Sequence, residues 1–352
     1  MLVRYKTLED GSVVKQAEIY TQDEHGISPE QIDFEARKII RRLSEKGHTA
    51  YVVGGAVRDL LVGKQPKDFD IATDAAPGRI RKLFRNSRVI GKRFRLVHIL
   101  LKDNQIIEVS TFRSRDSEGF QNIYGDIEDD ALRRDFSLNA LYYSTEDGTI
   151  LDYTNGFRDI QKRKVRPVIP LDRMFVEDPV RLIRAIKYSV GTGFRLTFRL
   201  KRKMKKSTHL LADVSPSRMT EELLKILESG KSRETFEQLL RFGIAGYVVP
   251  RLNELSAERG YTEKLLRSLG SLDELAERKD IGRDICLAYL CGDYLFAHSS
   301  LDPDSRIPFP DAFATMKHFL RPLAPPNRTV EDALAYLLKR KRNYLKTGRI
   351  DH

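Results

Sequence analysis

Apolar residues recur at helix-like spacing after Pro29 and then give way to short alternating segments. The first pattern runs from Ile32 to Leu43 and predicts a helix that ends by Gly47. The segments that follow predict strands at 51–53, 68–72, 96–101 and 106–111, with a helix at 77–84 between two of them. This alternation is typical of a mixed sheet with packed helices, so we expect an α+β head.

The second half of the chain has a different pattern. From about Val176 onward the strand signals fade, and a helix is predicted at 179–188. Another helix is predicted with Ser215 as N-cap, Pro216 as its first residue and Gly230 beyond its end. The stretch before Pro29 is polar and aperiodic. We therefore expect four parts, which are a polar N-terminal extension at 1–29, a catalytic head at 30–165, a helical neck at 166–245 and a helical body at 246–352.

Composition supports a folded chain of more than one domain. With 352 residues, of which 41% are hydrophobic, the chain can form real cores, and roughly 100–200 residues per domain allow two or three domains. No run of eighteen or more apolar residues occurs, and the first residues lack the apolar core of a secretory signal. We expect a cytoplasmic protein without membrane insertion. Cys286 and Cys291 give neither a disulfide framework nor zinc-site spacing, which predicts buried structural thiols.

Charge changes this picture more than composition does. The 62 Lys and Arg residues exceed the 50 Asp and Glu residues and give a net charge of +12. The excess is concentrated at 79–95, 194–206 and 339–342, where basic residues occur without acidic ones. Such runs repel themselves unless an anion or salt screens them, so their clustering favours RNA or DNA as a partner over a merely solvated basic surface.

A double glycine stands between a predicted strand and a predicted helix. Gly54 and Gly55 follow the strand at 51–53 and open the segment GGAVRD at 54–59. Residues without Cβ let the backbone approach a triphosphate, and the free N–H groups of the next helix turn point toward it. Taken alone, this motif is better explained by an ordinary tight turn.

Two acids share one face of the next predicted strand. Asp68 and Asp70 are two positions apart, while Phe69 between them points toward a core. Such a pair can share two Mg²⁺ ions, which lower the pKa of an attacking RNA 3′-hydroxyl and neutralise departing pyrophosphate. Glu108 on the strand at 106–111 is the third candidate carboxylate. Two solvated surface acids are the alternative, but the buried strand pattern and the glycine turn upstream disfavour it.

The segment RRDFSLNA at 133–140 combines arginines with small polar side chains. Arg134 can hold phosphates through two parallel hydrogen bonds, and Asp135 and Asn139 can bond sugar hydroxyls. A capped helix start explains the same residues equally well.

The segment EDPVRLIRA at 177–185 places an acid just before a predicted helix that Pro179 opens. Asp178 supplies acceptors and Arg181 a planar donor fork, and together they suit a Watson–Crick base edge without a nucleic-acid template. A surface salt bridge that caps the helix is the alternative.

With these four motifs in order, the chain resembles the class II superfamily of bacterial poly(A) polymerases and tRNA CCA-adding enzymes. The match spans about Thr49 to Arg195, and the helix at 215–230 also resembles the neck of this superfamily. The resemblance implies a head with a polymerase-β-like fold and a mixed sheet, a mostly α-helical neck and body, a two-Mg²⁺ site, and untemplated nucleotide addition to RNA 3′ ends.

The resemblance favours the poly(A) polymerase branch. The stretches 83–86, 89–99 and 122–131 are similar to segments that mark bacterial poly(A) polymerases. The loop at 114–121 is short and the C-terminal region is truncated relative to the longer members, although the tail keeps Lys339, Arg340, Lys341 and Arg342.

Carried over by position, the resemblance implies metal binding by Asp68 and Asp70, with Glu108 completing the catalytic carboxylates. It implies that the nucleotide's phosphates and sugar are bound by these residues: Gly54, Gly55, Arg58, Arg134, Asp135 and Asn139. Asp178 and Arg181 would face its base.

The implied activity is the addition of AMP from ATP to the 3′ ends of RNA, whether mRNA, tRNA or another RNA, with release of pyrophosphate. One alternative is a tRNA nucleotidyltransferase that adds all or part of the CCA end. Another is a non-catalytic RNA-binding relative, against which three acids at a nucleotide pocket argue because they would repel a polyanion. The sequence specifies no protein partner.

Overall fold

The computed structural model divides into two compact units, Met1–Leu171 and Asp172–His352. The structure describes all residues except 8–9, 92–94, 103–104, 115–122, 300–306 and 351–352. Lys92 and Arg93 of the basic run and most of the predicted loop at 114–121 thus lie outside the described residues. The finer division of the second half at 245 stays a prediction.

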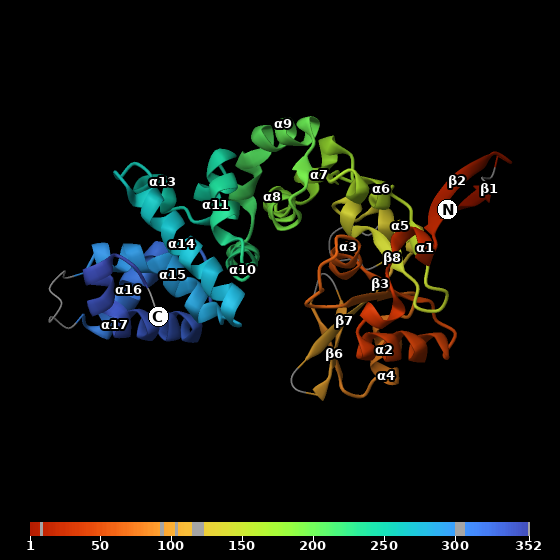
Figure 1. Ribbon diagram of the computed structural model, residues 1–352, viewed down its shortest axis with the longest axis horizontal. Helices are drawn as coiled ribbons and strands as arrows, with labels where there is room; N and C mark the ends of the chain where they lie inside the picture. The colour runs from red at the N-terminus through yellow and green to blue at the C-terminus, as the bar shows by residue number, and fades with distance from the viewer. Residues whose placement is uncertain (8–9, 92–94, 103–104, 115–122, 300–306, 351–352) are drawn as a thin grey trace. The chain divides into compact units, whose positions relative to one another are not determined.

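The first unit is built on a nine-stranded mixed sheet (Figure 1). Its strands are β1 (Leu2–Thr7), β2 (Val13–Tyr20), β3 (Ala50–Val53), β4 (Asp70–Thr73), β5 (Ser87–Ile90), β6 (Leu96–Leu100), β7 (Ile106–Thr111), β8 (Leu141–Tyr143) and β9 (Ile150–Asp152). The spatial order is β1-β2-β9-β8-β3-β4-β7-β6-β5, with β4 and β7 parallel and the other neighbours antiparallel. The predicted α+β class with a mixed sheet is confirmed.

Helices and short strands complete this unit. They are α1 (Gln22–His25), a 3₁₀ turn (Pro29–Gln31), α2 (Phe34–Ser44), α3 (Gly55–Leu61), α4 (Pro77–Leu83), α5 (Ile127–Leu132), a 3₁₀ turn (Ser137–Asn139), α6 (Gly156–Gln161) and β10 (Lys164–Val165). The predicted helix after Pro29 begins only at Phe34, where the side chain of Asp33 accepts a hydrogen bond from Ala36 N. Pro29 instead opens the preceding 3₁₀ turn, whose N-cap is Ser28.

The two faces of the central strands are covered differently. One cross-strand row contains Val52, Ile71, Val109 and Val97, all nearly inaccessible to solvent, on the side where α2 and α4 pack. Arg42 of α2 lies over the ring of Phe84 directly after α4, which places these two helices side by side. On the opposite face, Val53 and Ala72 pack with Ala131 of α5 in a second core. Each face therefore has its own apolar layer.

The N-terminal stretch is not the polar, aperiodic extension that its sequence indicates. Its strands β1 and β2 form an antiparallel hairpin, and β2 pairs with β9 to extend the sheet. Most of β1 is exposed, so it lacks the apolar alternation by which a half-buried strand is recognised. Strand β2 is anchored to α6 instead through Glu18, a buried acid that bonds Lys15 and Tyr20 of the same strand and Arg158 of α6.

The second unit is mostly helical, as predicted. Its elements are α7 (Leu171–Glu177), α8 (Arg181–Thr192), β11 (Arg195–Leu196), α9 (Phe198–Ser207), a 3₁₀ turn (Thr208–Asp213), α10 (Pro216–Leu227), α11 (Ser232–Arg241), α12 (Ala245–Val248), α13 (Leu252–Leu255), α14 (Tyr261–Arg278), α15 (Arg283–Ala297), α16 (Phe309–Leu320) and α17 (Asn327–Thr347). Helix α10 begins at Pro216 as predicted.

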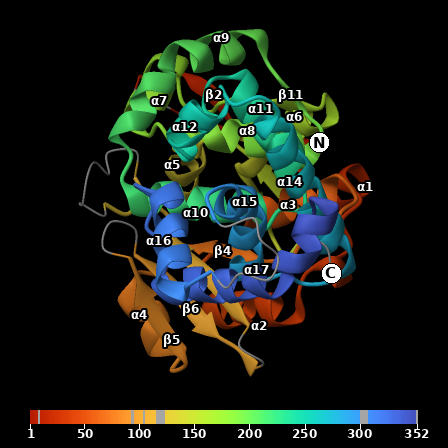
Figure 2. The same cartoon turned by 90° about the vertical axis from the view of Figure 1, so that its left-hand side faces the viewer.

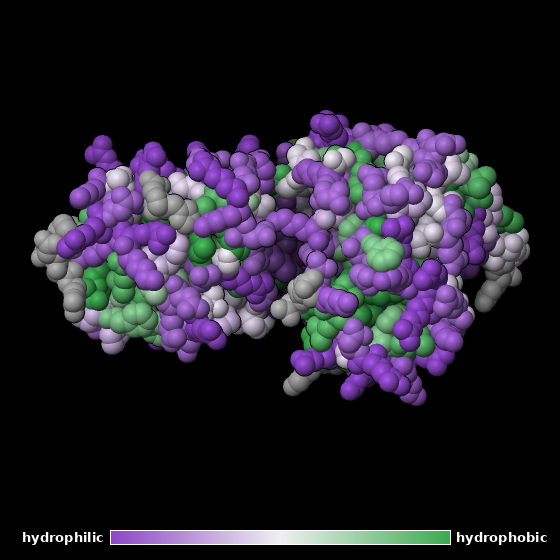
Figure 3. All heavy atoms as spheres, turned by 60° about the horizontal axis from the view of Figure 1, so that its bottom comes forward, coloured by the Kyte–Doolittle hydropathy of each residue, from purple (hydrophilic) through white to green (hydrophobic). Residues whose placement is uncertain are grey.

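Helix α15 forms the centre of this unit and packs against α10, α14, α16 and α17 (Figures 1 and 2). Both cysteines lie on α15, and burial raises the pKa of the Cys286 thiol to about 12. The prediction that they are buried is confirmed. Hydrophilic residues cover most of the visible face of the molecule (Figure 3). Among the described helices, none has the length and apolarity that crossing a membrane requires.

Candidate active site

The glycine turn connects the middle of the sheet to a short helix. Strand β3 ends at Val53, and Gly54 serves as N-cap of α3 with φ 72° and ψ −124°. A positive φ is strained for residues with a Cβ, so the chain direction here depends on glycine. A Cβ at Gly54 would also lie 3.4 Å from Arg134 Nη1. The turn therefore keeps the backbone close to an arginine.

The strand register brings two of the predicted acids to this turn. Asp70 is paired with Val53, the residue directly before Gly54. On the other side of β4, Ile71 is in register with Val109, which places Glu108 beside Asp70. Because side chains alternate along a strand, both acids lie on the face opposite Ile71 and Val109. Asp70, Glu108 and the glycine turn thus lie near one another, toward the same end of the central strands β3, β4 and β7.

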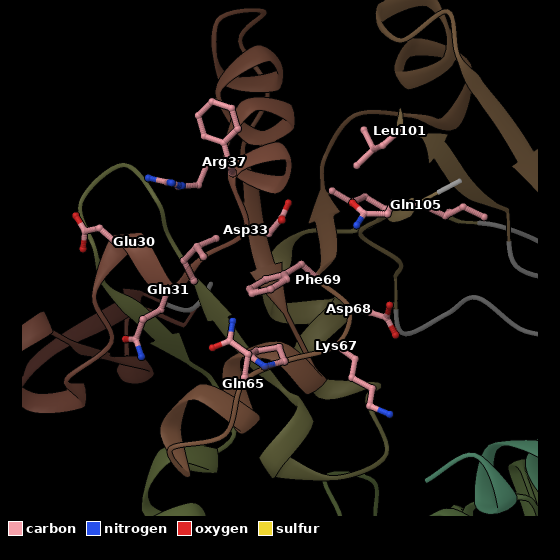
Figure 4. Close-up of a pocket in the computed structure, with 15 residues that line it drawn as sticks. Glu30, Gln31, Asp33, Arg37, Gln65, Lys67, Asp68, Phe69, Leu101 and Gln105 are labelled. Atoms are coloured by element: carbon pink, nitrogen blue, oxygen red, sulfur yellow. The ribbon is translucent and has the colours of Figure 1, made fainter. Parts of the chain in front are cut away.

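Asp68 is not part of the strand, contrary to the sequence prediction. Strand β4 begins at Asp70, because β3 reaches only Val53 and its chain then turns away at Gly54. Asp68 is exposed, while Phe69 is buried. The two side chains extend to opposite sides of the segment before β4 (Figure 4). The alternation expected for 68–70 is therefore kept, although the regular strand begins two residues later.

The acids form an open group of oxygen donors. Within the described part of the chain, no cluster of three or more His, Cys, Asp and Glu side chains is preformed to hold a metal ion. The Glu108 side chain is 45% exposed, and its Oε1 lies 3.0 Å from His98 Nε2. Mg²⁺ is commonly held by one or two carboxylates together with substrate phosphates, so Asp68, Asp70 and Glu108 supply suitable ligand chemistry.

Arg58 and Asn139 are joined across the glycine turn. Arg58 lies on α3, and its Nη1 donates to Asn139 Oδ1 at 2.8 Å, while its Nε donates to Asp59 at 2.8 Å. Asn139 ends a 3₁₀ turn and is only 7% exposed. The hydrogen bond fixes residues from two distant segments at one place.

Arg134 is held by three groups on the same side of the sheet. Its Nη1 donates to the Asn139 carbonyl at 3.1 Å, its Nη2 donates to Asp130 at 3.1 Å, and its Nε donates to the Tyr142 hydroxyl at 2.9 Å. Burial alone would lower the pKa of Arg134, but the oxygens of Tyr142 and Asp130 outweigh it and raise that pKa. The guanidinium stays charged in a fixed orientation.

Sequence reasoning missed three residues of this cluster. The buried Asp130 accepts hydrogen bonds from Tyr142 at 2.6 Å and from Arg134, so it orients the arginine. Arg113 also lies nearby, where burial and the charge of Arg133 lower the pKa of its guanidinium to about 10. A crowded group of cations is stabilised by a bound polyanion. The spacing between Asp130 and Arg134, one helical turn, was the only available signal.

Asp135 faces a local partner. It is 7% exposed, and its Oδ1 accepts a hydrogen bond from Phe136 N at 2.8 Å. Its carbonyl accepts from Val168 N at 3.1 Å, which ties this segment to the end of the first unit. The structure thus brings Gly54, Gly55, Arg58, Arg134 and Asn139 into one cluster, with Asp135 next to it in sequence.

Asp178 and Arg181 belong to the second unit. Helix α8 begins at Arg181 and not at Pro179, because the Asp178 side chain accepts from Val180 N at 3.2 Å and forms a turn before the helix. The other Asp178 oxygen accepts from Arg218 Nη2 at 2.8 Å.

Arg181 has partners of its own. Its Nη1 donates to the Met174 carbonyl at 2.8 Å and to Glu177 at 3.2 Å. The side chains of Asp178 and Arg181 are therefore each bonded to other residues of the second unit and not to one another.

A cavity of about 560 Å³ opens on the α2 side of the sheet, next to Asp68 (Figure 4). It lies between the start of α2, the segment at 65–69 and the start of β7. The residues that define it include Asp33, Arg37, Lys67, Phe69 and Gln105. Acidic and basic side chains both line it, so its charge selects no particular ligand.

Comparison with known proteins gives two family matches. Residues 50–166 match the family described as the poly A polymerase head domain. Residues 193–256 match the family described as the probable RNA and SrmB-binding site of polymerase A. The first range contains the glycine turn, the acids and the arginine cluster.

Individual relatives come from two kinds of enzyme. Poly(A) polymerase I of Salmonella typhi is 39% identical over 69% of this chain and 55% of its own length. The CCA-adding enzyme of Bacillus velezensis is 34% identical over 71% of this chain and 63% of its own length. The chain thus spans little more than half of the poly(A) polymerase that it matches.

Among solved structures, the Bacillus stearothermophilus CCA-adding enzyme in complex with CTP aligns with a TM-score of 0.64 and 29% identity. The alignment covers 89% of this chain and 70% of that one. These matches confirm the resemblance that the four motifs indicate.

Proposed function

Because the chain belongs to the nucleotidyltransferase superfamily of poly(A) polymerases and CCA-adding enzymes, we propose that it is a template-independent polynucleotide adenylyltransferase. It adds AMP from ATP to RNA 3′ ends and releases pyrophosphate. The observation that carries this proposal is the strand register, which puts Asp70 and Glu108 beside the glycine turn. Acids next to a cationic phosphate cradle are of use to an enzyme of this class and of little use to a simple polyanion binder.

In this proposal the first unit binds the triphosphate and the reacting ends. The backbone at Gly54 and Gly55 approaches the phosphates, and Arg58 and Arg134 neutralise them. Asn139 and Asp135 contact the sugar. In-line attack by the RNA 3′-hydroxyl needs no covalent enzyme intermediate, since positioning and electrostatic stabilisation suffice.

Asp68 and Asp70, with Glu108 beside them, would hold divalent metal ions. When bound, two Mg²⁺ ions supply activation of the attacking hydroxyl and charge neutralisation at the leaving group.

The second unit would supply base recognition and RNA binding. Asp178 and Arg181 face the adenine once they leave their present ion pairs. Helix α9 presents exposed cations, among them Lys201, Arg202 and Lys205, which fit an RNA backbone.

The test measures the extension of labelled RNA by each NTP in turn, with the wild type and with Asp70→Asn. We expect long tails from ATP alone, and a loss of incorporation on the order of a thousandfold in Asp70→Asn, with RNA affinity kept. Asp280→Asn, a change of the same type in an exposed segment of the second unit, should leave the rate unchanged. Normal extension by Asp70→Asn would show that the site is assigned wrongly.

The CCA-adding alternative is supported by the 34% identity to the Bacillus velezensis enzyme. A tRNA that lacks its CCA end separates the two activities. Incorporation of CTP into this tRNA favours the alternative, whereas ATP tails on unrelated RNA favour adenylate addition.

A further inference from the structure

The acids of the candidate site continue into a row that leads to the edge of the sheet. Glu108 on β7 pairs with His98 on β6, and His98 pairs with Arg88 on β5. Paired residues of neighbouring strands point to the same face, so Arg88 and His98 lie on the face that carries Asp70 and Glu108. The row therefore connects an edge arginine to the catalytic acids.

This part of the face combines a cation with exposed apolar surface. Two residues further along β5 and β6, Ile90 pairs with Leu96. Because side chains alternate along a strand, this pair lies on the same face as Arg88 and His98. Arg88 is exposed, Ile90 is 42% exposed, and the His98 side chain is 24% exposed. We call Arg88, Ile90, Leu96 and His98 the outer platform.

The opposite face of β6 is closed. Val97 and Ile99, which alternate with the platform residues of β6, are 0% and 2% exposed under α4. The side chain of Arg88 forms no hydrogen bond or ion pair with any other residue that the structure describes. The charge of Arg88 is thus available to a ligand.

The position of the platform fits a strand that leaves the active site. Neighbouring strands are about 4.8 Å apart, so Arg88 on β5 stands about 14 Å from Asp70 on β4. A stacked nucleic-acid strand advances about 3.4 Å per nucleotide, which makes this separation about four nucleotides. Both ends of the row belong to one sheet, so this separation is fixed.

We propose that the outer platform binds the RNA strand just upstream of its 3′ end, with a phosphate on Arg88 and bases against Ile90 and His98. This inference rests on the proposed function, which places the 3′ end at Asp70. Single-stranded RNA is recognised by cations that follow its backbone and by flat or apolar side chains against its bases. The platform offers both beside acids that would otherwise repel the approaching strand.

The experiment measures RNA binding by the full-length protein in the absence of ATP. Fluorescence anisotropy with labelled RNAs of three and ten nucleotides is compared for the wild type, Arg88→Ala and Arg41→Ala. Arg41 is the control because it is 75% exposed on α2, which packs on the other face of the sheet. Both variants remove one positive charge.

For the ten-nucleotide RNA, Arg88→Ala should raise Kd about threefold or more. It should also make the slope of log K against log salt concentration shallower by about 0.7, the value for one lost single-strand phosphate contact. The trinucleotide, which is too short to reach Arg88, should bind Arg88→Ala with the same affinity as the wild type. Arg41→Ala should bind both RNAs normally. Equal affinities of Arg88→Ala and Arg41→Ala for the longer RNA, or an equal loss for both lengths, would overturn the proposal.

A crosslink gives a second readout. A 4-thiouridine placed four nucleotides from the 3′ end should crosslink to a peptide within 86–100; crosslinks confined to α9 would count against the platform. Adenylate addition by the same preparation is measured in parallel. RNA binding that depends on Arg88 without any addition rejects only the adenylyltransferase, while addition to ten-nucleotide RNA at concentrations below Kd that is insensitive to Arg88→Ala rejects only the platform.

Discussion

Two of the residues proposed to contact the nucleotide, Arg134 in the first unit and Asp178 in the second, are held in contrasting ways. In the first unit, Arg134 bonds a carbonyl, a hydroxyl and the buried Asp130, and its side chain is 21% exposed. In the second unit, Asp178 is held by Arg218, which is 43% exposed. Arg134 therefore lies in a fixed hydrogen-bond network, whereas the ion pair that holds Asp178 is open to solvent.

This difference indicates how work is divided between the units. Groups fixed before the substrate arrives need no reorganisation when charge develops, which suits phosphates that are the same in every nucleotide. Exposed ion pairs contribute only about 0–1 kcal/mol, so their partners exchange at little cost. Under the proposed function, the Arg134 network is thus preorganised for the triphosphate, whereas the Asp178–Arg218 ion pair can be exchanged for a base.

Arg134→Ala should break the fixed set and give the largest effect. It leaves the buried Asp130 without its cation, which should cost about 2–3 kcal/mol after allowance for the partial exposure of the pair. Loss of a donor from the cradle should also lower the rate of nucleotide addition by on the order of a hundredfold. Urea unfolding and steady-state kinetics measure the two effects.

Arg134→Lys is the matched variant because it keeps the charge but not the planar fork. We expect it to recover most of the stability and little of the rate. Full activity in Arg134→Lys would mean that charge alone matters and that the fixed geometry does not.

Gly54→Ala should disturb the same set more gently. The φ of 72° strains any residue with a Cβ, and the new Cβ would contact Arg134 Nη1 at 3.4 Å. Gly63→Ala is the control, since Gly63 has φ 73° but nothing within 4 Å of its Cβ position.

Both glycine variants should lose about 1–2 kcal/mol of stability from backbone strain. Only Gly54→Ala should raise KM for ATP, by about tenfold, as expected when one phosphate contact is displaced. The same KM for ATP in both variants would show that the turn at Gly54 takes no part in phosphate binding.

Fold and site could be predicted from the sequence where the local apolar pattern agrees with the strand pairing. Strand β7 has its predicted bounds, because its buried and exposed positions alternate from Ile106 to Thr111. The motifs also identified the family, and the register placed Asp70 at the glycine turn. These features depend on residues close in sequence or on strands with a clear apolar face.

Features that depend on distant partners were not predictable. The hairpin of β1 and β2 lacks a buried apolar face, and its anchor Glu18 depends on Arg158 from α6. Asp130 gained its role only when β8 brought Tyr142 to it. Likewise, nothing in the order of residues near Asp178 indicated that Arg218, forty positions later, would hold its carboxylate.

Arg218→Ala tests the exchangeable set and should have the smallest effect. Removing this exposed partner should change the free energy of unfolding by less than about 1 kcal/mol. It frees the Asp178 carboxylate, so the preference for ATP over CTP, measured as the ratio of kcat/KM values, should change a few-fold while the rate at saturating ATP stays near that of the wild type. Arg233→Ala removes a comparably exposed ion pair on α11 and should leave the ratio unchanged. A loss of kcat as large as that of Arg134→Ala would show that Asp178 belongs to the fixed set, and the contrast between the two units would not hold.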